Sequence, residues 1–504
     1  MKSPGVQCYL IGAGPGDPGL LTIRAREVLS FVDVVIYDSL VNEAILDHCR
    51  KDCERIFAGK RAGFHHLSQD EIHQTMIQHL QAGRTIARLK GGDPFVFARG
   101  GEEMEAVDEA GFGFEVIPGI TSGSAVPAYA GIPLTHREWA SHVTFVTAHE
   151  RKDAEKSRIE WKRLAQLGGT LVVFMGAKSV KFWTQNLIGA GLDPETPAAF
   201  IQWGTRTYQR CVFGTVQTLE SSVRGAGLSS PAIAVIGQTA SLRDRLKWFE
   251  IKPLFGKRVV VTRSKEQNTS LRIMLRELGA EVLEIPTISI HPIDLPADID
   301  RRIAATQWLA FSSSNGVEYF LDAYCCDHDI RTLAHLKIAA VGSSTAATLR
   351  RYHLQVDYVP SEYRSAAMGQ QWPDEDRDHH VMYVCGSSAE ADFQQAMESS
   401  GYVFQRMEVY RTHEGIDASS PAADTYRNQG ADWLTFCSSS AARAFHAAFS
   451  AEIADTQKMA AIGPVTQEQM HKLGWSCTVM PEVSKLDLMV DKIVEHETSG
   501  SLRP

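Results

Sequence analysis

Short apolar runs alternate with amphipathic stretches along most of the chain. The clearest runs occupy residues 7–11, 34–37, 170–174, 259–261 and 381–384. The stretches between them carry apolar residues at helical spacing, and Ser68 followed three positions later by Glu71 has the form of a helix-capping box. Apolar strands that alternate with amphipathic helices predict an α/β protein with mainly parallel sheets.

A change of pattern after residue 250 predicts a domain boundary. A strand expected at 232–236 and a charged helix expected at 241–250 precede this point. A proline- and glycine-containing turn then leads into a new strand expected at 258–262. We therefore expect one domain at residues 1–250 and a second at residues 255–500.

The second domain contains a weak internal repeat. The segment FSSSNGVEYF from Phe311 is similar to FCSSSAARAF from Phe436, and VGSSTAATLRR from Val341 is similar to IGPVTQEQMHK from Ile462. The members of these pairs are 125 and 121 residues apart, and a nearly constant offset predicts two similar α/β lobes. Clefts between lobes are favoured binding sites.

Composition narrows the class of protein. The 504 residues are 44% hydrophobic and 22% charged, which is typical of globular proteins. A net charge of −9 argues against a nucleic-acid partner. The nine cysteines never have CxxC spacing, so we expect no zinc site and a reducing compartment. Since no apolar run reaches about 18 residues and no signal peptide is recognisable, we expect a cytoplasmic protein that is not in the membrane.

The first apolar run ends in the glycine-rich segment GAGPGDPG. A dinucleotide-binding fingerprint needs glycine at positions 12, 14 and 17, and position 17 is Asp17. This disfavours a nicotinamide-dependent dehydrogenase. What remains is a close backbone turn, stiffened by Pro15 and Pro18, where a ligand or another chain segment can approach.

Four further segments carry more specific information. They are YDSLV at 37–41, GKRAG at 59–63, RLKGGDPFVFARGGEE at 88–103 and PGITSGSAVPAYAGIPLTHR at 118–137. The first places Asp38 at the carboxyl end of a strand, where ligands bind in open α/β sheets. Together with GAGPGD, these segments resemble the uroporphyrinogen-III C-methyltransferase family, within the tetrapyrrole methylases, over about residues 6–245.

The resemblance implies a fold of two α/β lobes, S-adenosyl-L-methionine as methyl donor, and a homodimer formed through the methyltransferase domain. It implies that Asp38 is the general base and Lys60 the proton donor. Ser39 stands where the family frequently has arginine, which could weaken the grip on a substrate carboxylate. The positions that match the donor site are Pro15, Gly91, Gly92, Asp93, Val96, Thr121, Ser122, Met175 and Gly204.

Three arginines of the first domain have two possible roles. Arg88, Arg99 and Arg137 could clamp carboxylates of the substrate, because a guanidinium pairs with a carboxylate through two hydrogen bonds. They could equally be ordinary salt-bridge residues.

The second domain resembles uroporphyrinogen-III synthase over nearly all of residues 255–496, through the order and spacing of many short segments. The resemblance implies two lobes joined by two crossings, hydroxymethylbilane as substrate, and no metal or organic cofactor. It implies that Tyr410 helps the hydroxyl group to leave. Hydroxyl groups at strand ends and helix N-termini suit carboxylate binding. The residues expected to bind substrate are Arg263, Ser313, Ser344, Ser439 and Thr466.

The two resemblances together predict a bifunctional enzyme of tetrapyrrole biosynthesis. It would cyclise hydroxymethylbilane to uroporphyrinogen III and methylate that product twice to precorrin-2, on the branch to sirohaem and cobalamin. Each assignment supports the other, because the two reactions are consecutive. The alternative is a methylase of another corrin intermediate whose C-terminal lobe binds tetrapyrroles without catalysis.

Overall fold

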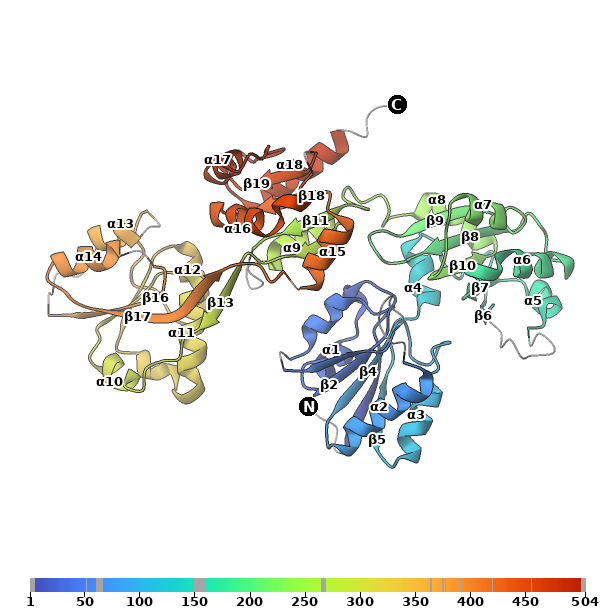
Figure 1. Cartoon of the computed structure of the whole chain (residues 1–504), viewed down its shortest axis with the longest axis horizontal. Helices are drawn as coiled ribbons and strands as arrows, with labels where there is room; N and C mark the ends of the chain where they lie inside the picture. The colour runs from blue at the N-terminus through green and yellow to red at the C-terminus, as the bar shows by residue number, and fades with distance from the viewer. Residues whose placement is uncertain are drawn as a thin grey trace. The chain divides into compact units, whose positions relative to one another are not determined.

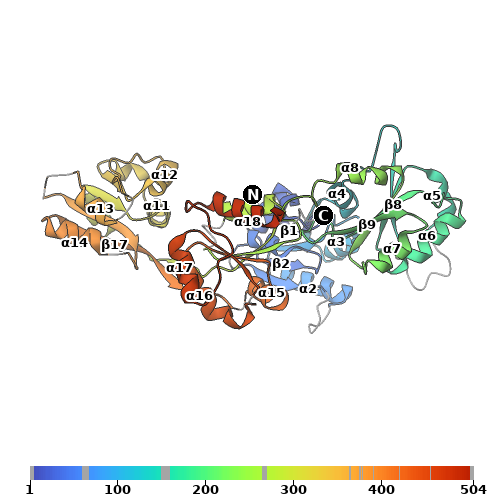
Figure 2. The same cartoon turned by 90° about the horizontal axis from the view of Figure 1, so that it is seen from above.

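The computed structural model describes residues 5–50, 52–59, 67–148, 159–263, 269–362, 365–373, 376, 378–389, 391–418, 420–454 and 456–499. The chain forms two compact units. The first runs to Arg258 and also holds Leu275–Glu281 and the chain from Glu497, and the second holds Val259–Met274 and Val282–His496. Each unit contains two lobes built on separate sheets (Figures 1 and 2), so the α/β fold class is confirmed.

The first lobe has a five-stranded sheet of order β3-β2-β4-β1-β5, with every neighbouring pair parallel. Helix α1 covers one face of this sheet, and α2 and α3 cover the other (Figure 1). The elements are β1 (Val6–Gly12), η1 (Pro18–Leu20), α1 (Ile23–Leu29), β2 (Val34–Tyr37), η2 (Glu43–His48), β3 (Glu54–Phe57), α2 (Gln69–Gln81), β4 (Ile86–Lys90), α3 (Gly100–Glu109) and β5 (Gly113–Ile117).

Helix α2 begins where the sequence predicts. The Glu71 backbone N–H donates to Ser68 Oγ (3.3 Å), and the Ser68 N–H donates to Glu71 Oε2 (2.6 Å), which confirms the capping box. The helix then buries Ile72, Met76 and Leu80, whose spacing places them on the face towards the sheet.

The second lobe has a sheet of order β6-β7-β10-β8-β9. Its elements are α4 (Ser122–Tyr129), β6 (Val143–Thr147), α5 (Trp161–Leu167), β7 (Thr170–Phe174), η3 (Ala177–Ser179), α6 (Val180–Gly189), β8 (Pro197–Gln202), β9 (Arg210–Thr215), α7 (Leu219–Gly225), β10 (Ala232–Ile236), η4 (Gln238–Leu242) and α8 (Arg243–Leu246).

This second sheet departs from the expectation of mainly parallel sheets. Strands β6 and β7 are parallel, but β10 is antiparallel to both β7 and β8, and β8 is antiparallel to β9. The connection between β8 and β9 is too short for a crossover to a parallel strand, which takes a dozen or more residues. Apolar runs alone do not reveal strand direction.

The charged helix predicted for residues 241–250 is wrong in its length. Regular α-helix covers only α8, and the chain then leaves the helical path. The rings of Trp248 and Phe249 pack against Tyr129, with centroids 5.0 and 4.8 Å apart, and Arg243 pairs with Glu250. These tertiary contacts outweigh the local preference for helix.

In the second unit, a sheet of order β12-β11-β18-β19 forms one lobe and a sheet of order β13-β17-β16-β14-β15 forms the other. The chain crosses between the lobes after β12 and again after β17, as expected. The first of these lobes contains β11 (Arg258–Val261), α9 (Thr269–Glu277), β12 (Glu281–Glu284), α15 (Pro421–Gln429), β18 (Trp433–Phe436), α16 (Ser439–Phe449), η6 (Ser450–Glu452), β19 (Lys458–Ala461), α17 (Pro464–Lys472) and α18 (Leu486–Ser499). The other contains β13 (Ile288–Pro292), α10 (Ile299–Ala304), β14 (Trp308–Phe311), α11 (Ser314–Asp327), η5 (Ile330–Leu333), β15 (Lys337–Ala340), α12 (Ser343–Arg351), α13 (Ser365–Gln370), β16 (His380–Gly386), α14 (Asp392–Ser399) and β17 (Val403–Glu414).

The predicted repeat of two similar lobes is confirmed. The parallel strands β16-β14-β15 of one lobe correspond to β11-β18-β19 of the other. Ser313 caps α11 with φ −162° and ψ 163°, and Ser438 caps α16 with φ −160° and ψ 158°. Gly342 and Gly463 precede α12 and α17 in equally similar, extended conformations. The two lobes therefore repeat their strand–helix junctions in detail.

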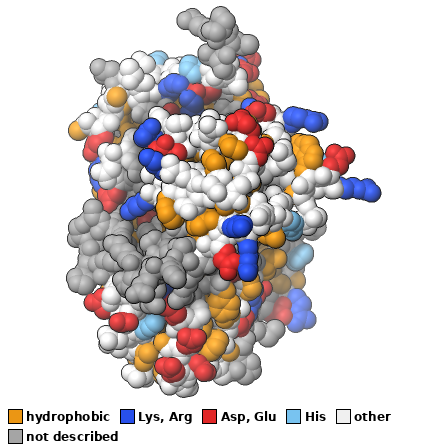
Figure 3. Space-filling view, turned by 90° about the vertical axis from the view of Figure 1, so that its right-hand side faces the viewer, with side chains coloured by type: hydrophobic (Ala, Val, Ile, Leu, Met, Phe, Trp, Pro, Cys, Tyr) orange, Lys and Arg blue, Asp and Glu red, His pale blue; other side chains and the backbone are white. Residues whose placement is uncertain are grey.

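Acidic and basic side chains are intermixed on the face that Figure 3 shows, with apolar side chains between them. Among the helices of the described residues, none combines the length and apolar character that crossing a lipid bilayer requires.

Candidate functional site

Three glycines of the first unit meet where β1, β4 and β5 end at one edge of the sheet. A Cβ atom on Gly12 would lie 2.7 Å from the Gly92 carbonyl oxygen, and one on Gly119 would lie 2.7 Å from the Gly12 carbonyl carbon. Real Cβ atoms do not approach backbone atoms so closely, so only glycine fits at these positions. This edge of the sheet therefore presents bare peptide groups.

Hydrogen bonds fix the loops around this meeting point of Gly12, Gly92 and Gly119, which we call the glycine crossing. Gly14 and Gly92 exchange two backbone hydrogen bonds of 3.2 and 2.7 Å, and both have left-handed backbone conformations. Asp93 accepts from the Gly119 N–H with Oδ2 (3.2 Å) and from the Phe95 N–H with Oδ1 (2.9 Å). Asp93 thus joins the loop after β4 to the loop after β5.

Asp38 lies beside this crossing. It directly follows β2, and its Oδ1 accepts a hydrogen bond from the Leu40 N–H (3.1 Å). A Cβ atom on Gly91 would lie 2.7 Å from the Leu40 Cβ, so the turn that holds Asp38 touches the diglycine segment. Lys60, the predicted proton donor, lies outside the described residues.

The second lobe contributes the N-terminus of α4 to the same place. Thr121 caps this helix by accepting a hydrogen bond from the Gly123 N–H (3.3 Å), and Ser122 is the first helical residue. A Cβ atom on Gly92 would lie 3.7 Å from the Ser122 backbone nitrogen. Gly204 packs against Val126 of the same helix.

Phe97 and Met175 line a hollow of about 400 Å³ next to the loop after β4. The Phe97 ring packs on Phe174 at 4.9 Å, and Val96 packs on the same apolar core. Met175 is 46% exposed. Five of the six non-glycine residues with positive φ in the described part of the chain lie in the first unit, and three of them line this hollow; such strain concentrates at functional sites. The five are Phe97, Arg99, Met175, Trp203 and Thr205.

Asp17 connects the two lobes of the first unit, a role that the sequence reasoning missed. Its backbone N–H donates to Thr205 Oγ1 (3.1 Å), and Tyr129 donates its hydroxyl proton to Asp17 Oδ2 (2.7 Å). Burial raises the pKa of Tyr129, and the bond to Asp17 raises it further. Pro15 lies in the short segment whose two ends these contacts fix, Gly14 to Gly92 and Asp17 to Thr205. The sequence clue to this role is Asp17 itself. It stands where a dinucleotide-binding fingerprint needs its third glycine, so its presence calls for another explanation.

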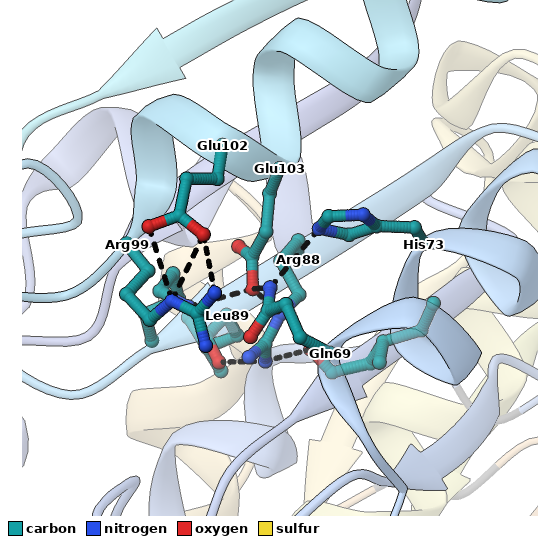
Figure 4. Close-up of polar contacts among 9 residues, drawn as sticks. Gln69, His73, Arg88, Leu89, Arg99, Glu102 and Glu103 are labelled. Atoms are coloured by element: carbon teal, nitrogen blue, oxygen red, sulfur yellow. Dashed lines mark hydrogen bonds and ion pairs between the residues drawn. The ribbon is translucent and has the colours of Figure 1, made fainter. Parts of the chain in front are cut away.

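A buried cluster of charges lies between β4 and the helices α2 and α3 (Figure 4). Glu103 of α3 accepts on Oε1 from Arg88 Nε (3.2 Å), Lys90 Nζ (2.8 Å) and Gln69 Nε2 (3.1 Å). Burial works to raise the pKa of Glu103, but the charges of Arg88 and Lys90 outweigh it and lower the pKa. Burial, with the charge of Arg88, lowers the pKa of Lys90. Arg88 is therefore a buried salt-bridge residue and not a substrate clamp.

The other two arginines differ from Arg88. Arg99 pairs with Glu102 on the surface of α3, as Figure 4 shows, so it too is a salt-bridge residue in this structure. Arg137 is exposed, and a role for it stays a prediction.

In the second unit, Tyr410, Ser313 and Ser344 come together at one sheet edge. The Tyr410 hydroxyl lies 3.0 Å from Ser313 Oγ, and Ser314 Oγ lies 3.1 Å from Ser344 Oγ. Burial raises the pKa of Tyr410, while the hydrogen bond with Ser313 acts to lower it. The site thus combines a protonated phenol with several hydroxyl groups.

The other lobe brings together Arg263, Ser439 and Thr466. Ser439 donates to the Val465 carbonyl (3.1 Å), and the neighbouring Thr466 is buried in α17. Burial raises the pKa of the Cys437 thiol to about 11, and the charge of Arg263 opposes this shift, so Arg263 lies near that strand end. The six residues predicted for the second unit therefore form two groups, one on each lobe.

No group of three or more His, Cys, Asp or Glu side chains placed to hold a metal ion occurs among the residues that the structure describes.

The fold and these sites define the class of protein. Two α/β lobes around a glycine crossing, followed by two repeated lobes with hydroxyl-rich strand ends, correspond to two enzymes of tetrapyrrole metabolism in one chain. Residues 7–220 match the family of tetrapyrrole (corrin/porphyrin) methylases, and residues 269–491 match uroporphyrinogen-III synthase HemD.

Individual proteins match the whole chain or its first half. The chain is 36% identical over 491 residues to porphyrin biosynthesis protein HemD of Ruminiclostridium josui, which covers 96% of this chain and 97% of that protein. It is 48% identical over 242 residues to a uroporphyrinogen-III C-methyltransferase of Bacillus subtilis (strain 168), covering 48% of this chain and 94% of that protein. A uroporphyrin-III C-methyltransferase structure from Thermus thermophilus, complexed with S-adenosyl homocysteine, is 34% identical, covers 47% of this chain and 99% of that chain, and has a TM-score of 0.40.

The chain belongs to the family of porphyrin-biosynthesis proteins that join a tetrapyrrole methylase to a uroporphyrinogen-III synthase. It is a bifunctional tetrapyrrole enzyme, with an S-adenosylmethionine-dependent methyltransferase followed by a cyclising synthase.

The buried cluster gives a stability prediction. Glu103→Gln leaves Arg88 and Lys90 buried without a counter-charge, and we expect it to destabilise the first unit by about 3–5 kcal/mol. Glu102→Gln is a matched control in the same helical turn, but its partner Arg99 is exposed, so we expect a change of about 0–1 kcal/mol. Urea unfolding followed by circular dichroism measures both variants. Equal effects would contradict the role of the buried cluster.

Proposed function

We propose that the first unit transfers two methyl groups from S-adenosylmethionine to uroporphyrinogen III, giving precorrin-2. We propose that the second unit makes this uroporphyrinogen III from hydroxymethylbilane. The product would enter the branch to sirohaem and cobalamin. The names of the related proteins support the proposal, and so does the pairing of two consecutive reactions in one chain.

The observation that carries the methyl-transfer proposal is the glycine crossing of Gly12, Gly92 and Gly119. Peptide groups without side chains suit a donor that must lie close to the backbone. Gly91, Gly92, Asp93, Thr121 and Ser122, five of the nine positions carried over from the resemblance, belong to the segments that meet here. Asp93 supports the same proposal, because its carboxylate lies beside Gly119 at the crossing and its negative charge would attract a cationic donor. The Met175 side chain at the hollow would contact the donor's apolar part.

When bound, the donor would supply an electrophilic methyl group. The chain's own task is to hold a pyrrole carbon in line with that methyl, and such positioning contributes several kcal/mol. The methylated pyrrole then carries a positive charge until it loses a proton. Asp38, at the carboxyl end of β2 and in contact with the diglycine turn, would accept this proton. Lys60 stays the proposed proton donor.

For the second unit, the Tyr410 phenol would protonate the hydroxyl group that leaves hydroxymethylbilane. Strand-end hydroxyls and the N-termini of α11, α12, α16 and α17 would hold the carboxylates of the open chain, because N–H groups at helix starts attract anions. Ser313, Ser344, Ser439, Thr466 and Arg263 are the proposed binding residues.

Other features of the proposal concern the whole protein. We propose a cytoplasmic homodimer, joined through a methyltransferase domain of residues 1–250, with a synthase domain of residues 255–500 and no metal requirement. Nine unpaired cysteines support a reducing location. Sedimentation equilibrium of the full chain and of residues 1–250 tests the dimer, since both should sediment as twice the monomer mass.

Single substitutions should separate the two activities. Asp38→Asn is expected to lower methylation of uroporphyrinogen III about 100-fold or more, because it removes a general base, while cyclisation continues. Tyr410→Phe is expected to lower cyclisation and leave methylation intact. Product analysis by absorbance, fluorescence and isomer separation measures both reactions.

The wild type decides between the proposal and its alternative. If it forms only the type I isomer from hydroxymethylbilane, the second unit is not a synthase. If donor is consumed with another corrin intermediate but not with uroporphyrinogen III, the first unit is a different methylase.

The crossing makes a separate prediction about donor binding. Gly119→Ala forces a methyl group against the Gly12 backbone, and overpacking of this kind costs about 1–3 kcal/mol. We expect the affinity for S-adenosylhomocysteine to fall about tenfold or more, measured by titration calorimetry. Gly225→Ala is the control, because a Cβ there meets no atom within 4 Å and the residue is helical. An unchanged affinity in Gly119→Ala would place the donor elsewhere.

A further inference from the structure

Ser313 has two contacts that act on different parts of the second unit. It accepts a hydrogen bond from the Gly316 N–H (3.0 Å), which caps α11, and it lies 3.0 Å from the Tyr410 hydroxyl. A serine oxygen has two lone pairs and one proton. While the Ser313 oxygen accepts the hydrogen bond from the Gly316 N–H, its hydroxyl can still donate a hydrogen bond to the Tyr410 oxygen.

The repeated lobe shows that the capping contact alone does not explain Ser313. Ser438 has nearly the same φ and ψ and caps α16 by accepting from the Ala441 N–H (3.1 Å). Its hydroxyl, however, lies 3.0 Å from Ser440 Oγ and not against a tyrosine. Of the two capping serines, Ser313 is therefore the one that pairs with a tyrosine hydroxyl, and that tyrosine is Tyr410, the proposed acid.

Neighbouring groups fix the Tyr410 ring against Ser313. A Cβ atom on Gly386 would lie 2.5 Å from Tyr410 Cε2, so the ring lies directly on this backbone. The Ser387 N–H donates to the Tyr410 carbonyl (2.9 Å). Arg406 donates to the carbonyls of Gly386 (3.2 Å), Ser387 (3.1 Å) and Ala389 (3.0 Å) and thereby holds the loop in place.

We propose that Ser313 is a positioning residue for the cyclisation, which donates a hydrogen bond to the Tyr410 hydroxyl oxygen and so directs the phenol proton towards the leaving hydroxyl group. This inference rests on the proposed synthase function of the second unit. The helix N-terminus supports the arrangement, because the Gly316 N–H polarises the serine hydroxyl and makes it a better donor.

The step balances as follows. Tyr410 gives its proton to the hydroxyl oxygen, the C–O bond breaks, and water leaves with the bonding electron pair. The pyrrole nitrogen's lone pair forms the new double bond of the electrophilic azafulvene. The resulting phenolate accepts the hydrogen bond from Ser313, and it regains a proton when the closed ring loses one. The net change is loss of one water.

The groups around the phenol determine its expected titration. Burial raises the pKa of Tyr410, the bond from Ser313 lowers it, and a charge on Cys385 of β16 would raise it. Tyr319 of α11 lies 5.7 Å away between ring centroids, and the paired position on β13 is Pro292. An acid works only while protonated, so a raised pKa keeps it active into alkaline pH. Removing the Ser313 bond should raise that pKa further and make the phenol a weaker acid.

The experiment titrates Tyr410 in the full chain labelled with 13Cζ-tyrosine, with Tyr410→Phe to assign its signal. In Ser313→Ala we expect the titration of Tyr410 to move to higher pH. We expect kcat for uroporphyrinogen III formation to fall about tenfold, as for one lost hydrogen bond to a developing charge, with KM little changed. Ser313→Thr keeps the hydroxyl and should restore both values.

Ser438→Ala is the matched control, because it removes an equivalent helix cap from the repeated lobe. It should lower the melting temperature as Ser313→Ala does and leave the Tyr410 titration unchanged. If Ser313→Ala folds poorly, Ser313→Gly serves in its place, since glycine is tolerated at a helix cap.

If the titration of Tyr410 does not move in Ser313→Ala, Ser313 acts only as the cap of α11 and the proposal is wrong. A wild type that makes no uroporphyrinogen III would instead overturn the synthase function, and the titration would still report whether Ser313 donates to Tyr410.

Discussion

Three segments of the chain meet at Gly12, Gly92 and Gly119, where Gly12 and Gly119 leave no room for a Cβ atom and Gly92 has a left-handed backbone conformation. Much of the first unit is arranged around this contact. The Asp93 carboxylate joins two of the three loops, the turn of Asp38 touches the adjoining diglycine, and α4 directs its N-terminus to the same point. A larger residue at Gly12 or Gly119 would push the loops after these strands apart, together with the groups that they hold, and at Gly92 it would strain the backbone. The crossing is therefore the constraint that brings residues from two lobes to one place.

The buried charges of Arg88, Lys90 and Glu103 help to fix the loop that leads to the crossing, and burying them costs free energy. Removing Arg88, Lys90 and Glu103 from water is unfavourable, and an apolar trio of similar volume could be as stable. The charged trio, however, defines a single arrangement, because one carboxylate oxygen must meet three donors. Arg88 also donates to the Ile36 carbonyl of the neighbouring strand. Lys90 directly precedes the diglycine turn, so a fixed Lys90 means a fixed start for the loop that forms the crossing.

The sequence predicts features that depend on a recognisable pattern along the chain, and it does not predict those that depend on contacts between residues far apart in the chain. The strands at 34–37 and 170–174, the cap of α2 and the lobe repeat depend on local pattern, and each is as expected. The diglycine–aspartate loop was recognisable because only glycine permits such a turn. The link between Asp17 and Tyr129 spans 112 positions, and no local pattern signals it. The early end of α8 has the same cause, since the packing of Trp248 on Tyr129 depends on the folded unit. The antiparallel sheet was missed because apolar runs carry no direction.

The second unit shows how two repeated lobes can give equivalent capping serines different partners, Tyr410 in one lobe and Ser440 in the other. The capping serines are equivalent, and the difference lies in the strand at the far side of each parallel core. In one lobe this is β12, with four residues, and in the other it is β17, with twelve. At the end of β16 the pairing with β17 slips by one residue, so that Cys385 pairs with Glu408 but Gly386 pairs with Tyr410. Such a bulge re-aims the following side chain. It turns Tyr410 over Gly386, the one residue type that leaves room for the ring, and onto Ser313. A longer strand, one inserted residue and one glycine thus bring the tyrosine proposed as the acid onto a capping serine, while the counterpart Ser438 lies beside Ser440 at the start of α16.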